Sequence, residues 1–236
     1  MQLIGFALLG FIVWFGFSDR DANQVISAFD PHAAVMVAFG SLAAVLISSD
    51  TTTAARTFSS LRELVPGLRV FSRGTSTLEK EREQISLLWR EGKRSAALTI
   101  SEQSRFPAIK QMIDLILNRA HNATSERVFL ELRHAEIGRF QPAINNREML
   151  SKLGPAFGMV GTITGMVQMF RNMSADNLNI GSSMSLALLA TLYGVTFGAG
   201  VAGPTGHFLN GLLDDRLGAL ERCEKTVSEL VVRGGA

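Results

Sequence analysis

Cysteine and charge are both scarce in this chain. It has one cysteine, Cys223, and only 19% of its residues are charged. A single cysteine excludes an intramolecular disulfide and any cysteine-based zinc or iron–sulfur cluster within one chain. The sequence also contains no nucleophile–base set and no phosphate-binding loop, because the segment GMVGTITG does not end in Gly-Lys-Ser/Thr. We therefore expect a protein that is not an enzyme and that holds no metal and no cofactor.

The charged residues that are present are concentrated in one block. Residues Thr51 to Lys152 hold 17 of the 23 Lys and Arg and 11 of the 21 Asp and Glu. The basic residues are interleaved with acidic ones and form no dense cluster, so we expect no binding to nucleic acid. Outside this block the chain is strongly apolar, which favours a membrane protein with one large polar insert.

Four apolar windows contain no Asp, Glu, Lys or Arg and are long enough to be candidate helices across a bilayer core of about 30 Å. They are Leu3–Phe17, Ala33–Ser49, Gly154–Phe170 and Ser183–Leu213. No Lys or Arg precedes the first window, so we expect an uncleaved helix rather than a signal peptide. Four crossings place both termini on one side of the membrane. The positive-inside rule, applied to the basic block, makes that side cytoplasmic.

The polar block has the pattern of helices. Apolar residues at steps of three and four predict helices at Leu78–Ala97, at Phe106–Ala120 and at Glu126–Phe140 with Thr124 as its N-cap. Pro142 should break or kink the last helix before the third span. No segment alternates with a period of two, so the sequence predicts an all-α chain. Its predicted parts are transmembrane helices 1 and 2 (1–50), a cytoplasmic helical domain (51–152), transmembrane helices 3 and 4 (153–213) and a C-terminal cytoplasmic helix (214–236).

The third and fourth windows are rich in glycine, serine and threonine. The segments at these windows, residues 154–173 and 181–204, read GPAFGMVGTITGMVQMFRNM and GSSMSLALLATLYGVTFGAGVAGP. Helices that pack closely or line a polar pathway need such residues, whereas lipid-facing helices do not. Because no span carries a carboxylate, an ion pathway through them needs one from a partner. Alternatively, the hydroxyl groups only bond back to their own backbone, and for Thr162 and Thr191 both interpretations stay open.

These two segments resemble the third and fourth membrane helices of the MotA/PomA stator subunits, within the MotA/TolQ/ExbB group. The segment DPHAAVMVAFGSLAAVLISS resembles the second helix of the same subunits. The resemblance implies a homopentamer in the bacterial inner membrane, around a dimer of a MotB-like protein with a single membrane span. It further implies that an aspartate in that span binds the ion, and that inward ion flow turns the pentamer and so exerts torque on a partner machine.

The resemblance also assigns roles to individual residues. Pro155 matches the family's proline at the start of the third helix, and Pro204 matches the proline near the cytoplasmic end of the fourth. Thr162 and Thr191 match threonines that face the pore. Sodium-driven members have a further threonine just before the second of these, where this chain has Ala190. The resemblance therefore favours H⁺ over Na⁺ as the transported ion.

One charged residue matches the family's contact with the flagellar rotor. Arg90 corresponds to the arginine of that contact, but the glutamate that follows it in the family falls at Ala97, and Lys93 and Arg94 replace a leucine pair. An exposed helix charge with no rotor role is the alternative for Arg90. The driven machine is then either the flagellar rotor or a non-flagellar system, such as envelope energy transduction or anti-phage defence. A non-conducting membrane scaffold is the remaining alternative.

Overall fold

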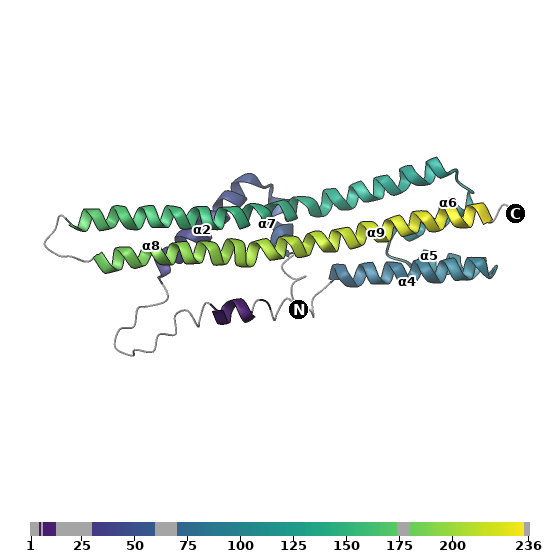
Figure 1. Cartoon of the computed structure of the whole chain (residues 1–236). Helices are drawn as coiled ribbons and strands as arrows, with labels where there is room; N and C mark the ends of the chain where they lie inside the picture. Colours follow the sequence, from purple (N-terminus) through teal and green to yellow (C-terminus); the bar gives the residue numbers. More distant parts are fainter. Residues whose placement is uncertain (1–4, 6, 13–29, 60–69, 174–179, 234–236) are drawn as a thin grey trace. The chain divides into compact units, whose positions relative to one another are not determined.

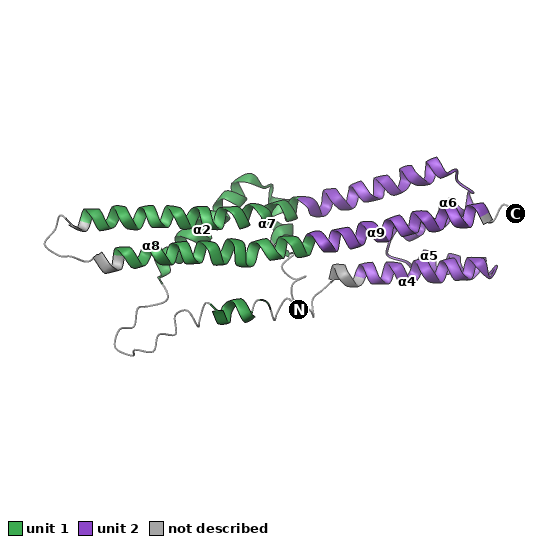
Figure 2. Cartoon of the chain, in the orientation of Figure 1, with its two compact units in different colours: residues 1–65, 142–209 green, residues 66–141, 210–236 purple. Residues whose placement is uncertain are grey.

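The computed structural model of the chain describes residues 5, 7–12, 30–59, 70–173 and 180–233. These residues form helices joined by short turns, with no strand among them (Figure 1). The chain divides into two compact units, which consist of residues 1–65 with 142–209 and of residues 66–141 with 210–236 (Figure 2). The predicted all-α class is confirmed.

The first unit is built from apolar helices. It holds α2 (Pro31–Ser48), α3 (Thr51–Ser59), α8 (Ile180–Val195) and the π-helix η3 (Thr196–Ala202), and it shares α7 (Asn122–Met173) and α9 (Gly203–Arg233) with the second unit. Helix α2 begins at a cap, because Asp30 Oδ1 accepts a hydrogen bond from the backbone N–H of His32 at 2.8 Å. Pro31 follows in the first turn, where its missing N–H costs nothing.

Three helical stretches are long and apolar enough to cross a membrane. They are Pro31–Ser48, Asn122–Arg171 and Ser183–Val232, and they contain the second, third and fourth predicted spans. The first predicted span, Leu3–Phe17, lies mostly outside the described residues. Its described part, residues 5 and 7–12, is helical.

The second unit is a bundle of amphipathic helices. It adds α4 (Val70–Arg90), α5 (Arg94–Gln103) and α6 (Pro107–Leu117) to the ends of α7 and α9. Its core consists of fully buried side chains from all five helices, among them Leu78, Ile85, Ala97, Ile109, Met112, Phe129, Leu220, Cys223 and Val227. Ion pairs surround this core and join α9 to the other helices, namely Arg222 with Glu79, Arg133 with Glu224, Arg90 with Glu229 and Arg216 with Glu136.

The predicted helix Leu78–Ala97 is wrong in its end, because the chain turns at Gly92. Gly92 has φ +77° and lies between α4 and α5. The N–H of Gly92 donates to the Trp89 carbonyl at 3.2 Å and that of Lys93 to the Leu88 carbonyl at 2.9 Å, which is a Schellman C-cap. Glycine adopts this left-handed conformation without a steric penalty. The signal was therefore present in the sequence as a lone glycine near the end of a periodic segment.

Substitution of Gly92 by alanine is expected to destabilise the second unit by about 1 kcal/mol, because a Cβ disfavours the left-handed conformation. Thermal unfolding of the purified protein measures this change. Gly92→Asn is the matched control, since asparagine tolerates positive φ, and it should melt close to the wild type. Equal melting of the alanine and asparagine variants would contradict the assignment of the turn.

Of the break or kink predicted at Pro142, the break is wrong, because α7 runs without interruption for 52 residues and contains both Pro142 and Pro155. A proline inside a helix costs about 3 kcal/mol through the lost hydrogen bond and the clash of its ring. The packing of so long a helix outweighs that cost. The predicted N-cap at Thr124 is shifted as well, since α7 already begins at Asn122 and the Thr124 N–H donates to the His121 carbonyl. The predicted helix at Phe106–Ala120 is confirmed as α6, which ends at Leu117, and the described part of the predicted C-terminal helix (214–236) is helical within α9.

Candidate functional site

A glycine seam joins α7 to α8 and η3 within the first unit. A Cβ placed on Gly154 would lie 2.7 Å from the Gly194 carbonyl oxygen and 2.7 Å from the Gly198 Cα. A Cβ on Gly158 would lie 3.1 Å from the Ala190 carbonyl oxygen, and one on Gly194 would lie 2.5 Å from the Gly154 carbonyl oxygen. Small residues let helix backbones approach this closely in membranes. Backbone contact along the seam leaves no room for water or an ion between these two helices.

Ala190 lies in this seam. It is fully buried, and its methyl group occupies the space that a side chain on Gly161 would need, with the two Cβ positions 2.2 Å apart. Further along, a Cβ on Gly165 would lie 2.8 Å from the Ala187 Cβ. Ala190 also packs with Ala33 and Val37 of α2. The structure thus places Ala190 in a helix contact of its own subunit, where a threonine would have to displace α7.

Thr162 and Thr191 are half-buried, and each bonds to its own helix. Thr162 Oγ1 donates to the Met159 carbonyl at 2.7 Å, and Thr191 Oγ1 donates to the Ala187 carbonyl at 3.2 Å. These bonds are the back-bonding that hydroxyl groups commonly make in helices. Each bond uses the hydroxyl proton only, so the oxygen lone pairs stay available to water or a cation. The two interpretations of these threonines therefore do not exclude each other.

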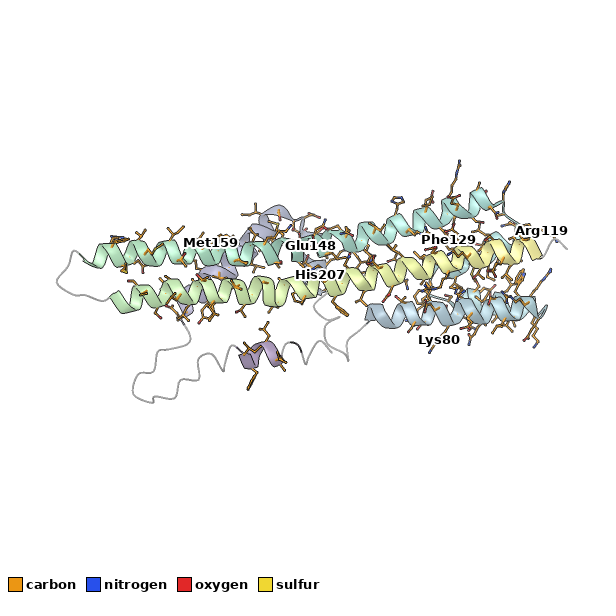
Figure 3. The ribbon with its side chains drawn as sticks, in the orientation of Figure 1. Lys80, Arg119, Phe129, Glu148, Met159 and His207 are labelled. Carbon is orange, nitrogen blue, oxygen red and sulfur yellow. The ribbon has the colours of Figure 1, made fainter. Side chains whose placement is uncertain are left out.

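Both threonines lie beside rows of apolar residues that are exposed in the described part of the chain. On α7, the exposed residues Met159, Ile163, Met166 and Phe170 are spaced four, three and four apart, and Thr162 is adjacent to them. On α8, Met184, Leu188 and Val195 are exposed, and Thr191 completes the same spacing between Leu188 and Val195. Met159 marks the α7 face in Figure 3. Spacings of this kind are typical of a seam that receives another helix.

The two prolines lie in different surroundings. Pro155 is half-buried in the glycine seam, where its Cδ would lie 2.5 Å from a Cβ on Gly198. Because Pro155 has no N–H, it leaves the Ser151 carbonyl without its usual donor, and Gly198 packs against that carbonyl. Pro204 is exposed in the first turn of α9, directly after η3. The structure therefore brings Pro155, but not Pro204, to the contact between α7 and η3.

Sequence reasoning missed a polar cluster between α3 and the part of α7 that precedes Gly154. The Asn146 side chain accepts a hydrogen bond from Ser49 Oγ at 3.0 Å and donates one to Thr57 Oγ1 at 2.9 Å. Arg147 is buried, and its Nη2 donates to the Thr57 carbonyl at 3.0 Å. These bonds attach α3 to α7. The only sequence signal was a pair of polar residues in the predicted helix, which does not reveal burial.

The turn after Arg90 carries exposed positive charge. Arg90 Nη2 lies 3.2 Å from Glu229 Oε2, Lys93 Nζ lies 2.8 Å from Glu91 Oε2, and Arg94 lies over the Trp89 ring. The hydrogen bond that Lys93 Nζ donates to the Glu91 carboxylate raises the pKa of Lys93, so this side chain keeps its charge at neutral pH. Ala97, at the position of the family's glutamate, is instead fully buried in the core of the second unit. Arg90 and position 97 therefore do not form one exposed charge pair.

Comparison with known proteins connects this geometry to a family. The sequence profile described as "MotA/TolQ/ExbB proton channel family" matches residues 102–222. Motility protein A of Cereibacter sphaeroides is 43% identical over 82 residues, which are 35% of this chain and 29% of that protein. Motility protein A of Aquifex aeolicus is 33% identical over 106 residues, which are 45% of this chain and 40% of that protein. The matched segments thus span less than half of these curated relatives.

Two solved structures share the fold over nearly the whole chain. The MotAB structure of C. jejuni matches with a TM-score of 0.80 at 11% identity and covers 98% of this chain and 88% of that one. The flagellar MotAB stator complex of Bacillus subtilis matches with a TM-score of 0.75 at 21% identity and covers 97% of this chain and 88% of that one. At such low identity the likeness establishes the fold.

Proposed function

This chain belongs to the MotA/TolQ/ExbB proton channel family, and we propose that it is the ion-conducting stator subunit of a rotary motor in the bacterial inner membrane. In this proposal five copies surround a dimer of a MotB-like single-span protein, both termini of each copy lie in the cytoplasm, and residues 51–152 form its cytoplasmic insert. Inward flow of H⁺, or alternatively Na⁺, turns the pentamer. The subunit itself catalyses no reaction and holds no cofactor.

One observation carries the proposal: the seam within the subunit is closed, whereas the half-buried Thr162 and Thr191 lie beside exposed apolar residues of α7 and α8. Backbone contact between Gly154 and Gly194 excludes a pathway between α7 and α8. Thr162 and Thr191 are half-buried next to exposed apolar residues of α7 and α8, and in this proposal a helix of another chain completes their surroundings. No predicted span carries a carboxylate, so the group that binds the ion comes from that helix. In this proposal the subunit supplies hydroxyl oxygens, and an aspartate of the partner supplies the carboxylate that binds the ion.

Replacement of Thr191 by valine is expected to lower ion flux by about tenfold or more, because it removes an oxygen that interacts with water or the ion, worth roughly 1–2 kcal/mol. Flux is measured as H⁺ uptake by vesicles that contain the subunit and its co-purified partner, in sodium-free buffer with and without an uncoupler. Thr205→Val is the matched control. Thr205 is buried and donates to the Ala202 carbonyl at 2.9 Å, so it lies away from any pathway on the outer faces.

The outcomes separate the candidate functions. Unchanged flux in the Thr191 variant would remove this threonine from the pathway. A wild-type chain that purifies without a single-span partner bearing a membrane aspartate, and that passes no ion, would leave the scaffold as the function. Flux that requires sodium would replace H⁺ by Na⁺.

The flagellar rotor is the first candidate for the machine that the motor drives. A non-flagellar machine is the second candidate, and the turn after Arg90 favours it. In this turn Arg90 is paired with Glu229, position 97 is buried, and Lys93 and Arg94 add positive charge. A rotor contact through an exposed arginine–glutamate pair is therefore not available in the family's form. Loss of swimming on deletion of the gene, with restoration by the wild type and not by Arg90→Ala, would instead establish the flagellar rotor.

A further inference from the structure

The helical stretch from α8 to α9 is interrupted by a full π-helical segment. This segment, η3, comprises Thr196–Ala202, and the N–H of Gly203 donates to the Gly198 carbonyl, five residues earlier. The π-helix is rare, and it is found frequently at functional sites. Its sequence, TFGAGVA, has glycine at two of seven positions.

The burial pattern shows what η3 does to the register of this helix. The buried positions of α8 are 183, 186, 187, 189, 190 and 194, those within η3 are 198 and 202, and those of α9 are 205, 206, 209, 212, 213, 216, 219, 220, 223, 226, 227 and 230. Up to residue 190 and from residue 202 onwards, these positions or adjacent pairs of them recur about every 3.5 residues, as in a helix with one continuous contact face. Between 190 and 202, however, three steps of four follow one another. The helix therefore contains one residue more than its contact face needs, and the π turn takes up that residue.

The extra residue decides which side chain meets Pro155. If α8 continued as an α-helix, its contact face would reach position 197, which is phenylalanine. In the π form Gly198 takes this place, where a Cβ would lie 2.5 Å from Pro155 Cδ and 2.7 Å from the Ser151 carbonyl oxygen. A phenylalanine side chain does not fit there unless α7 moves away. The π and α forms of this segment thus correspond to a closed and an opened seam.

A contact from the N-terminal helix favours the π form. Leu9 Cδ1 lies 2.6 Å from the position that a Cβ on Gly200 would take. Leu9 is half-buried, whereas all other described residues of that helix are exposed, so this contact is where the helix docks. One residue of register corresponds to about 100° of rotation around the helix axis. We call the space beside Gly200 that Leu9 occupies the notch at Gly200. Conversion of η3 to an α-helix would therefore turn this notch away from Leu9.

We propose that η3 is a two-state joint of the stator, a role that rests on the proposed function. In its π form Gly198 closes the seam and Leu9 occupies the notch at Gly200. In its α form Phe197 enters the seam and separates α7 from α8. The exposed face that contains Thr191 and Val195 ends directly at η3, so a partner helix that binds this face differently in its ion-bound and ion-free states biases the joint.

Two single-residue deletions and one substitution test the joint. Deletion of Thr196 removes the extra residue and brings Gly198 to position 197, so the helix is α throughout and its seam is intact. Deletion of Ala199 also removes one residue but leaves Phe197 on the seam. Thr196→Val removes the same hydroxyl group as the first deletion at unchanged length. We expect the Thr196 deletion to melt at or above the wild-type temperature, the Ala199 deletion to melt below it, and Thr196→Val to behave like the wild type.

Activity then separates a working joint from a passive insertion. With the partner present, the Thr196 deletion should retain its assembly but lose about 90% or more of ion-driven rotation, because it is fixed in one state. Assembly together with wild-type rotation would overturn the proposal. If this deletion does not assemble, hydrogen exchange of the wild type decides. Amides 199–203 should then exchange about tenfold faster than those of the flanking turns, and equal protection would overturn the joint. Absence of ion flux in the wild type would contradict the proposed function. The melting temperatures of the deletion variants and the hydrogen exchange of the wild type would still test the joint.

Discussion

Replacement of Gly154 by alanine is expected to destabilise the first unit by about 3 kcal/mol, the upper part of the range for overpacking. The added methyl group would meet the Gly194 carbonyl oxygen at 2.7 Å and the Gly198 N at 2.8 Å. Both are backbone atoms, so no side-chain rotation relieves the contact and α7 must move away from η3. The melting temperature and the yield of assembled oligomer in detergent measure the effect.

The matched control is the same substitution elsewhere on α7. A Cβ on Gly138 would have no atom within 4 Å, and alanine is the better helix former by about 1 kcal/mol. Gly138→Ala should therefore raise the melting temperature slightly, while Gly154→Ala lowers it and reduces the amount of oligomer. If both variants melted alike, the backbone contact along the seam would be wrong.

Introduction of a glutamate at position 97, which restores the residue type of the flagellar family, is expected to destabilise the second unit by about 3–5 kcal/mol. Ala97 is fully buried beside Ile85 and Ile109, and a carboxylate there loses its hydration without gaining a partner. The pKa of this new carboxyl group rises above its value in the unfolded chain. The loss in free energy of unfolding relative to the wild type therefore becomes smaller as the pH falls towards about 4, and larger as the pH rises above this value. Thermal unfolding at several pH values measures both effects.

Ala96→Glu provides the control, because Ala96 is the exposed neighbour of Ala97 on α5. It adds the same charge to the same helix and should melt within about 0.5 kcal/mol of the wild type. A stable Ala97→Glu variant would show that α5 presents this position to solvent. It would also revive the exposed arginine–glutamate pair as a rotor contact.

The elements that the sequence predicted well are those whose signal is long and periodic. The charge-free windows around Val37 and Leu189 are as long as a membrane span requires, and both lie in helices that can cross a membrane. The steps of three and four around Ile113 and Leu220 likewise predicted the helices that form the second core. Periodicity reports which face is buried, and that face persists whatever the neighbouring elements are.

Boundaries and contacts were harder, for physical reasons that particular residues illustrate. Pro142 predicted a break because its local cost is known, but the packing of a helix as long as α7 is not visible in a sequence. The extra residue in η3 is visible only once the buried positions on both sides are known. Burial of Asn146 and Arg147 depends on α3, which packs against α7. No local sequence pattern predicts this packing.

The candidate site was predicted in part. The small residues of the third and fourth windows do form a close helix contact, as their composition indicated. Sequence reasoning could not tell which of them are buried in the seam, since Ala190 is fully buried there whereas the adjacent Thr191 is only half-buried. Only the packed structure separates them, because the face that a helical residue presents depends on where its neighbour lies.

The glycine seam has a consequence for the entropy of assembly. In water, a glycine in a helix is costly because the unfolded chain around it is so free. A helix in a membrane is different, because its backbone must stay hydrogen-bonded even when the helix is alone. The freedom that Gly158 and Gly194 would have in an aqueous unfolded chain is therefore already absent before the helices meet. Their close contact is gained without that loss, which makes a chain with 22 glycines compatible with a firmly packed pair of helices.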